Sequence, residues 1–230
     1  MASSGSGDRY ESVRRAYDAV AEDYSRLIPD TRAEAPIDLA MIDAFVAAVG
    51  PGGRVIDSGC GAGRMSRYLA DRGLRVQGLD LSSRMVSIAQ RLHPDLSFIE
   101  GSISDLPYES STLDGLVLWY STIHTGRDGQ GALYQEASRV LRPGGHLLVG
   151  FQTGAGVHDT APTYRRHGHD IELVRHRFMP DEVAAWLTAS GLVETCRMVR
   201  SSQGSEKDGQ AVLLARLGQP AQTSTSSAPV

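Results

Sequence analysis

An acidic residue followed by alternating glycines marks one stretch of the chain as a candidate ligand site. Asp57 follows the apolar residues 55–56, and Gly59, Gly61 and Gly63 come next. Glycine has no Cβ, so a loop built from it can turn sharply and let a ligand lie against the main chain. A strand, a glycine turn and a helix in this order predict a nucleotide-sized site lined with backbone N–H groups.

The spacing of these glycines argues against two common nucleotide motifs. A dinucleotide site needs G-x-G-x-x-G, but Arg64 takes the third position counted from Gly59, and Ser66 takes it counted from Gly61. A P-loop is also excluded, because no Gly-Lys-Ser/Thr run follows. The acid two residues before the first glycine suits a cationic ammonium group better than a pyrophosphate.

A second acidic residue ends the next predicted strand. Residues 74–80 read as a strand whose last residue is Asp80. A carboxylate in this position can accept hydrogen bonds from both hydroxyls of a ribose. A helix should follow, with Ser82 or Ser83 as its N-cap. The buried stripe of that helix is expected to contain Met85, Ile88, Ala89 and Leu92.

Four segments in this order resemble the class I S-adenosylmethionine-dependent methyltransferases. They are the glycine loop, the acid and Ser-containing turn at 80–85, the segment 98–108, and the Pro-Gly-Gly turn within 139–149. The resemblance covers residues 10–217 approximately. It implies S-adenosylmethionine as cofactor and S-adenosylhomocysteine as product. It also implies a Rossmann-like α/β fold: a seven-stranded, mostly parallel sheet with helices on both faces and an antiparallel C-terminal strand.

The resemblance also implies which residues bind the cofactor. They are Tyr17, Tyr24, Asp57, Ser58, Gly59, Cys60, Gly61, Gly63, Asp80, Leu81, Met85, Ser102, Ile103 and Trp119. Ser102 departs from the family, which usually has an Asp there to receive the adenine amino group. Ser102 can still accept a hydrogen bond, and Asp105 is the alternative acceptor. For Tyr17 and Tyr24, packing in the core is the competing interpretation.

The segment after the fourth predicted strand is where an acceptor should meet the cofactor, because ligands of open α/β sheets sit beyond the carboxyl ends of the strands. His124 is the first candidate for a general base, since histidine titrates near neutrality and related methyltransferases often carry a His here. Tyr120 is a candidate for orienting the substrate. Both side chains could instead only anchor the loop. The run 119–122 lacks the Asn/Asp-Pro-Pro-Tyr/Phe motif of amino-directed nucleic-acid methyltransferases.

Residues 152–179 read as an irregular stretch that holds several of the seven histidines. We expect a lid that faces the substrate, with His167 and His169 as second candidates for the base. A solvated loop with incidental histidines is the alternative. His167 and His169 have no partner pair at ligand spacing, so we expect no metal.

The rest of the chain suits one methyltransferase domain over residues 8–217. An N-terminal helix from Tyr10 to Arg26 belongs to a covering segment at 8–35, while residues 1–7 and 218–230 have the composition of disordered ends. A hairpin of two strands, 192–200 and 210–217, should close the sheet.

The bulk properties narrow the range of partners. The net charge is −4, the two cysteines sit in separate elements, and no long apolar run or signal-peptide core is present. We therefore expect a cytoplasmic monomer or homodimer that acts on a small molecule, with no nucleic-acid or membrane partner.

The expected reaction is methyl transfer to a small-molecule acceptor by direct displacement. O-methylation in bacterial specialised metabolism, with His124 as base, is the leading hypothesis, and N- or C-methylation stays open. A protein of this fold could also bind S-adenosylmethionine without transferring methyl, as an accessory subunit or as a different catalyst. The glycine spacing disfavours an oxidoreductase.

Overall fold

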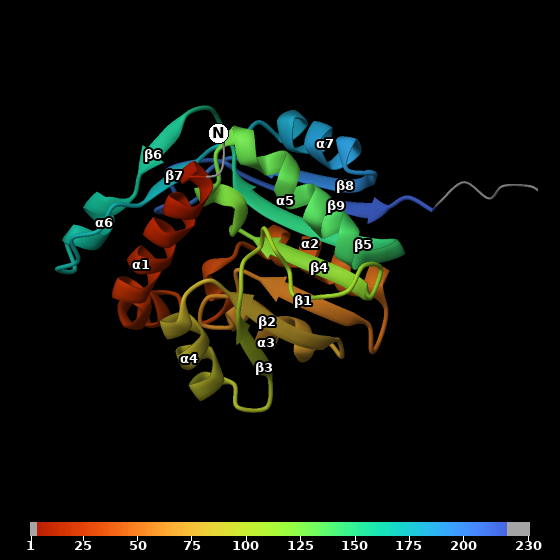
Figure 1. Ribbon diagram of the computed structural model, residues 1–230, viewed down its shortest axis with the longest axis horizontal. Helices are drawn as coiled ribbons and strands as arrows, with labels where there is room; N and C mark the ends of the chain where they lie inside the picture. The colour runs from red at the N-terminus through yellow and green to blue at the C-terminus, as the bar shows by residue number, and fades with distance from the viewer. Residues whose placement is uncertain (1–3, 220–230) are drawn as a thin grey trace, which may run out of the picture.

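The computed structural model describes residues 4–219 and contains a seven-stranded sheet with the order β3-β2-β1-β4-β5-β9-β8 (Figure 1). The strands are β1 Arg54–Ser58, β2 Arg75–Asp80, β3 Ser97–Glu100, β4 Leu113–Trp119, β5 Leu141–Gln152, β8 Leu192–Arg200 and β9 Gln210–Leu217. Only β9 runs against its neighbours, and it pairs antiparallel with both β5 and β8. The predicted fold and its closing hairpin are confirmed.

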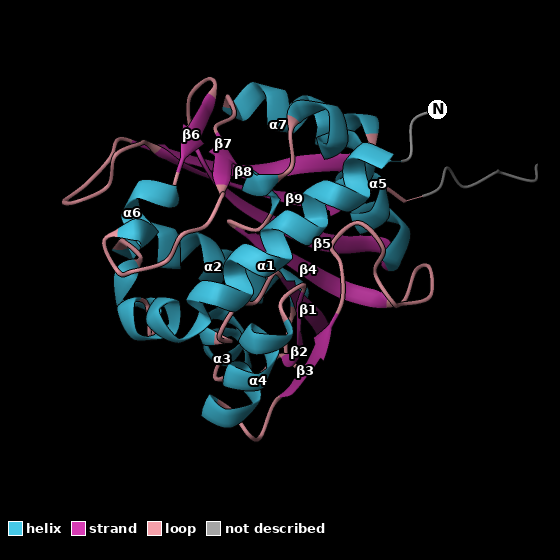
Figure 2. Ribbon diagram, turned by 60° about the vertical axis from the view of Figure 1, so that its left-hand side comes forward, coloured by secondary structure: helices cyan, strands magenta, loops and turns pink. Residues whose placement is uncertain are grey.

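Helices cover both faces of this sheet (Figure 2). They are α1 Ser4–Leu27, α2 Pro36–Val49, α3 Arg64–Ala70, α4 Ser83–Leu92, α5 Arg127–Val140 and α7 Pro180–Ala189. Side chains of α5 and α7 pack on one face, and side chains of α2 and α3 pack on the other. No helix among the described residues is long and apolar enough to cross a membrane.

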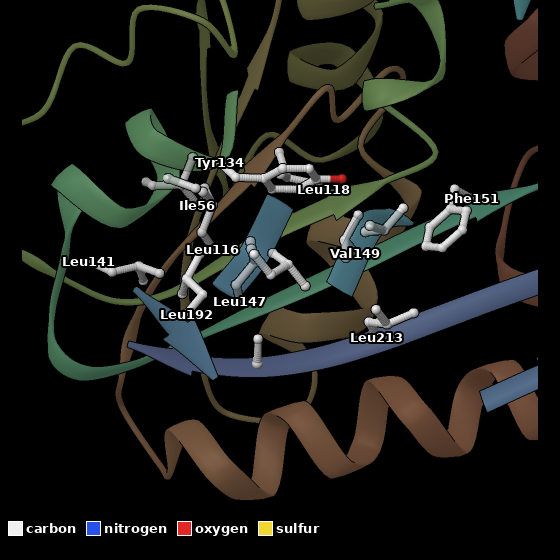
Figure 3. Close-up of a cluster of buried hydrophobic side chains, with 14 of the residues drawn as sticks. Ile56, Leu116, Leu118, Tyr134, Leu141, Leu147, Val149, Phe151, Leu192 and Leu213 are labelled. Carbon is white, nitrogen blue, oxygen red and sulfur yellow. The ribbon is translucent and has the colours of Figure 1, made fainter. Parts of the chain in front are cut away.

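The core explains why the central strands are apolar on both faces. Along β4, Leu116 and Leu118 point to the layer of α5 and α7, while Val117 points to the layer of α2 and α3. Figure 3 shows the first of these layers, where Tyr134 of α5 lies over the strands. Strands buried on both faces read as continuous apolar runs rather than alternating ones.

The ends of the chain differ in part from the expectation. Helix α1 begins at Ser4, so residues 4–7, expected to be disordered, are helical. Residues 1–3 and 220–230, which complete the two predicted disordered ends, lie outside the described residues.

Residues 152–179 are more ordered than the sequence suggested. They contain β6 Val157–Asp159 and β7 Val174–His176, which pair antiparallel, and the short helix α6 Ala161–Arg165. Figure 1 shows these elements and α1 together at one end of the large sheet. We call residues 152–179 the lid segment.

Helix α4 begins as predicted, with one difference in its buried face. The Ser82 hydroxyl accepts a hydrogen bond from Met85 N at 3.1 Å and is the N-cap. Leu92 was expected to be buried but is 48% exposed. It is the last residue of the helix, where the chain turns away, so Val86 takes its place in the buried face.

Candidate active site

One cavity of about 530 Å³ lies where the predicted site segments meet. Its wall is formed by α1, the glycine loop, the end of β2, the turn after β4, the lid segment and the loop between β8 and β9. Ten of the predicted cofactor residues line it: Tyr17, Tyr24, Gly59, Gly61, Asp80, Leu81, Met85, Ser102, Ile103 and Trp119. The fold therefore brings together segments from most of the chain.

The glycine loop needs its glycines for conformation and for space. Gly59 and Gly61 have φ values of +80° and +53°, in the left-handed region that favours glycine. A Cβ added at Gly59 would overlap the side chain of Ser121, which follows β4. The loop can therefore pass close to the turn after β4 only with glycine in this position.

The N–H groups of this loop are already used within the protein. The amides of Gly59 and Cys60 donate to the Leu79 carbonyl oxygen at 2.7 and 3.0 Å, and Gly61 N donates to Asp80 Oδ2 at 2.8 Å. The expectation of a site lined with backbone N–H groups is therefore wrong for these three amides. Without them the loop offers little to a phosphate, in agreement with the exclusion made from the spacing.

Asp80 joins the glycine loop to the next helix. Its Oδ2 accepts from Gly61 N, and its Oδ1 accepts from Ser82 N at 2.9 Å. Burial raises the pKa of this carboxyl, and the two backbone N–H groups oppose that rise. Each carboxylate oxygen has a second lone pair. Asp80 lines the cavity and can accept hydrogen bonds from two hydroxyls.

Asp57 is placed differently from the expectation. It is 1% exposed, and its Oδ2 accepts from the Ser66 hydroxyl at 2.6 Å. Burial raises the pKa of Asp57 to about 6. It borders a small adjoining space of about 30 Å³ that Cys60 also borders. Asp57, Ser58, Cys60 and Gly63 are absent from the wall of the main cavity.

Glu34 is a cavity residue that sequence reasoning missed. Its side chain is 5% exposed, and its Oε1 accepts from the Arg64 guanidinium and from Trp119 Nε1 at 3.1 Å. Glu34 lies in the connection between the first two helices, outside every motif. A carboxyl residue in a segment without a periodic pattern carried no signal that could have singled it out.

Part of the segment 98–108, which was expected to contact the adenine, lines the cavity. Ser102 and Ile103 line it, but Asp105, the alternative acceptor, does not. The Ser102 hydroxyl lies 2.8 Å from the Ser104 hydroxyl. Asp105 instead pairs through its backbone with Ser102 in an isolated β-bridge. Of the two candidates, Ser102 is the one that lines the cavity.

His124 lines the cavity and has a fixed tautomer. Its Nδ1 lies 2.6 Å from the Val174 carbonyl oxygen, which can only accept, so Nδ1 carries the proton. Its Nε2 therefore accepts from the Tyr17 hydroxyl at 2.7 Å. Burial lowers the pKa of His124 to about 4. The reason for choosing this residue, titration near neutrality, is thus wrong, although the neutral ring keeps one unprotonated nitrogen.

The other two catalytic candidates are placed very differently. Tyr120 lines the cavity with φ 56°, and burial raises its pKa well above the usual range. His169 does not line the cavity, and its Nε2 pairs with Asp23 Oδ2 of α1 at 2.6 Å. His167 is exposed, whereas His158 lines the cavity. The sequence could not predict which histidines of the lid segment line the cavity, because the pairing of β6 with β7 sets their positions.

Charged residues surround the end of the cavity that is formed by the lid segment and the loop between β8 and β9, which we call the lid end. Arg175 of β7 and Arg177, which directly follows β7, both bind the Asp208 carboxylate, with closest distances of 2.5 and 3.1 Å. Arg200 pairs with Asp38 and with Glu206. Within residues 4–219, no three His, Cys, Asp or Glu side chains are grouped so that they could hold a metal ion.

Comparison with known proteins places this architecture in a family. A model of the methyltransferase domain matches residues 55–145. The chain is 32% identical to the malonyl-(acyl-carrier protein) O-methyltransferase of Enterobacter lignolyticus over 168 residues, which are 71% of this chain and 64% of that protein. It is 30% identical to the enzyme of the same name from Pseudescherichia vulneris over 177 residues, 73% of this chain and 68% of that protein. The chain belongs to the class I S-adenosylmethionine-dependent methyltransferases.

A solved structure has the same fold. The 1,6-didemethyltoxoflavin-N1-methyltransferase of Burkholderia thailandensis, with 1,6-didemethyltoxoflavin and S-adenosylhomocysteine bound, matches with a TM-score of 0.74. The identity is 20%, and the match covers 95% of this chain and 93% of that one. The chain spans slightly less than two thirds of the Enterobacter relative's length, and it matches this solved chain almost completely.

The cavity residues fit the cofactor of this family, S-adenosylmethionine. Asp80 can receive ribose hydroxyls, and Gly59 and Gly61 of the glycine loop line the same cavity. Five buried polar atoms on cavity residues have no hydrogen-bond partner within the described residues: Glu34 Oε2, Ser121 Oγ, Gln152 Oε1, Arg175 Nε and Gln210 Oε1. Buried polar atoms without partners are rare in native proteins, and a bound molecule is one way to satisfy them.

Proposed function

We propose that the protein transfers the methyl group of S-adenosylmethionine to a small-molecule acceptor, and that the accepting atom is a hydroxyl oxygen. The observation that carries the proposal is one cavity whose wall runs from the glycine loop and Asp80 to His124 and the lid segment. Its volume of about 530 Å³ lies within the range of small-molecule sites. Cofactor and acceptor would meet beside the turn after β4.

When bound, the cofactor supplies a methyl group on a positively charged sulfur, which is a good leaving group. The protein must then align the acceptor and exclude water, and such positioning can lower a barrier by as much as ~7–11 kcal/mol. Asp80 and the glycine loop would hold the adenosyl part. Helix α1 and the lid segment would cover the reacting groups, with Tyr17 and Tyr24 closing over the cofactor and Tyr120 positioning the acceptor.

The state of His124 supports a hydroxyl acceptor. A hydroxyl must lose its proton when it is methylated, and the unprotonated Nε2 of His124 can take it. The acceptor would either replace Tyr17 as the hydrogen-bond donor or pass its proton through the Tyr17 hydroxyl. An amine that is already neutral needs no such base, so loss of His124 should matter less for it.

Calorimetric titration with S-adenosylmethionine and S-adenosylhomocysteine tests the cofactor. Micromolar binding that Asp80→Ala weakens and Asp95→Ala does not would support the proposal, because Asp95 is exposed and absent from the cavity wall. If neither compound binds the unmodified protein, the proposal fails.

Mass spectrometry of phenol and amine panels then tests the acceptor. His124→Ala should slow methylation of hydroxyls by ~10²–10⁴-fold. An undiminished rate would remove His124 as the base. Tyr17→Phe separates the two proton routes, since it should slow the reaction only if the proton passes through Tyr17.

A further inference from the structure

The amino-acid end of the cofactor needs a partner for its ammonium group, and Asp57 is poorly placed to be one. Asp57 is absent from the wall of the main cavity, and the Ser66 hydroxyl occupies its Oδ2. Its role is to tie the end of β1 to α3. If the proposed function is right, a carboxylate on the wall of the main cavity is better placed than Asp57, which borders only the small adjoining space, to meet the positive charge.

Glu34 is the carboxylate at the matching place. It lines the main cavity beside the glycine loop, next to Trp119 at the end of β4. Its side chain is 5% exposed, and its Oε1 holds both hydrogen bonds that it accepts, from Arg64 and Trp119. Its Oε2 is buried and has no donor among the residues that the structure describes. A buried carboxylate oxygen without a donor is unfavourable, and an ammonium N–H would satisfy it.

Arg64 supplies the opposite charge at the same place. It begins α3, directly after Gly63, and its side chain is 14% exposed on the cavity wall. Its one hydrogen bond within the described residues goes from Nη1 to Glu34. A guanidinium has five N–H donors in a planar fork that suits a carboxylate. Donors on Arg64 are therefore left for an anionic group of a ligand.

We propose that Glu34 and Arg64 form one subsite for a zwitterionic α-amino acid group, in which Glu34 Oε2 accepts from the ammonium and Arg64 donates to the carboxylate. This inference rests on the proposed function, because it assigns the methionine end of S-adenosylmethionine. The ion pair presents both charges at once, which a phosphate could not use, since the Glu34 carboxylate would repel it. The site thus selects an amino-acid-bearing nucleoside.

Two nucleosides that differ only at this end test the subsite. S-adenosylhomocysteine carries the amino acid group, and 5′-methylthioadenosine lacks it. Calorimetry should show that Glu34→Gln weakens S-adenosylhomocysteine binding by ~10-fold or more, as expected for a lost charge-assisted hydrogen bond. Binding of 5′-methylthioadenosine to the same variant should stay within about twofold of the unmodified protein. Glu109→Gln, an exposed residue absent from the cavity wall, is the matched control.

Decarboxylated S-adenosylmethionine separates the two members of the pair, because it keeps the ammonium and lacks the carboxylate. Glu34→Gln should weaken its binding, whereas Arg64→Gln should weaken S-adenosylhomocysteine much more than the decarboxylated compound.

Three outcomes would overturn the subsite. They are retained S-adenosylhomocysteine affinity in Glu34→Gln, an equal loss for both nucleosides, and an equal loss for both compounds in Arg64→Gln. Because each comparison uses two ligands on one protein, partial unfolding cannot imitate the expected result. Failure of the proposed function looks different: the unmodified protein would then bind none of the nucleosides, or would bind them and methylate no acceptor.

Discussion

The two ends of the cavity are built in different ways. At the glycine-loop end, main-chain groups fix the geometry: three loop amides donate to Leu79 O and to Asp80, which the strand β2 positions. At the lid end, side-chain pairs between separate segments do this work. Arg175 and Arg177 of the lid segment bind Asp208, which lies in the loop between β8 and β9.

This difference suits a protein with one cofactor and an acceptor that varies between relatives. A site fixed by main-chain hydrogen bonds to a sheet tolerates little change, since altering it disturbs the strands themselves. A site made of long side chains on loops can change by substitution while the sheet stays intact, which is why binding residues concentrate on loops held by a rigid scaffold.

The largest effect is expected at the glycine-loop end, from Gly59→Ala. The substitution forces a left-handed φ on alanine and pushes its Cβ into Ser121. Strain and overpacking together should lower the free energy of unfolding by about 2–5 kcal/mol and abolish S-adenosylhomocysteine binding. Urea unfolding with calorimetry would measure both.

Gly131→Ala is the control for this prediction. Gly131 lies inside α5, and an added Cβ there meets nothing within 4 Å. This variant should gain about 0.5–1 kcal/mol, because alanine favours a helix interior. If Gly59→Ala were as stable and as competent in binding as the unmodified protein, the glycine-loop end would not be as rigid as we argue.

A second effect concerns His124, where the two ends meet. Its folded pKa of about 4 lies below the usual 6.5, so the unfolded chain binds its proton first as the pH falls. Stability should therefore fall between pH 6.5 and 4, and this residue's share is roughly 3 kcal/mol. His124→Gln does not titrate, so its unfolding free energy should depend less on pH over this window.

Subtracting the unfolding free energy of His124→Gln from that of the unmodified protein at each pH leaves the contribution of His124. The subtraction removes the contributions of groups that stabilise the folded state as the pH falls. Asp57 is one of these, since its pKa is raised to about 6 and its contribution favours the folded state at low pH. If chemical unfolding gave curves of equal slope for the unmodified protein and His124→Gln, the imidazole would be solvated, and the closed arrangement around it would be wrong.

The sequence predicted the glycine-loop end far better than the lid end, for a physical reason. A strand such as β1 can be recognised by its apolar residues, and the glycines follow it at fixed spacing, so the sequence could single out Gly59 and Asp80, which both line the cavity. The partners of His124 are Tyr17 and Val174, which lie 107 and 50 residues away along the chain. No local pattern encodes such contacts, so neither the lowered pKa nor the tautomer could be predicted.

The smallest effect is expected at the lid end, from Asp208→Asn. The change removes a charge shared by two arginines whose side chains are 20% and 30% exposed, so solvent screens part of the loss. Unfolding free energy should fall by about 1–2 kcal/mol, because the Asp208 side chain is only 9% exposed while both arginines reach solvent. S-adenosylhomocysteine affinity should stay within about twofold, since main-chain bonds hold the glycine-loop end, while KM for an identified acceptor should rise. Asp181→Asn, which removes an exposed partner of Arg197, is the matched control. A tenfold loss of S-adenosylhomocysteine affinity in Asp208→Asn alone would mean that the two ends are one cooperative unit.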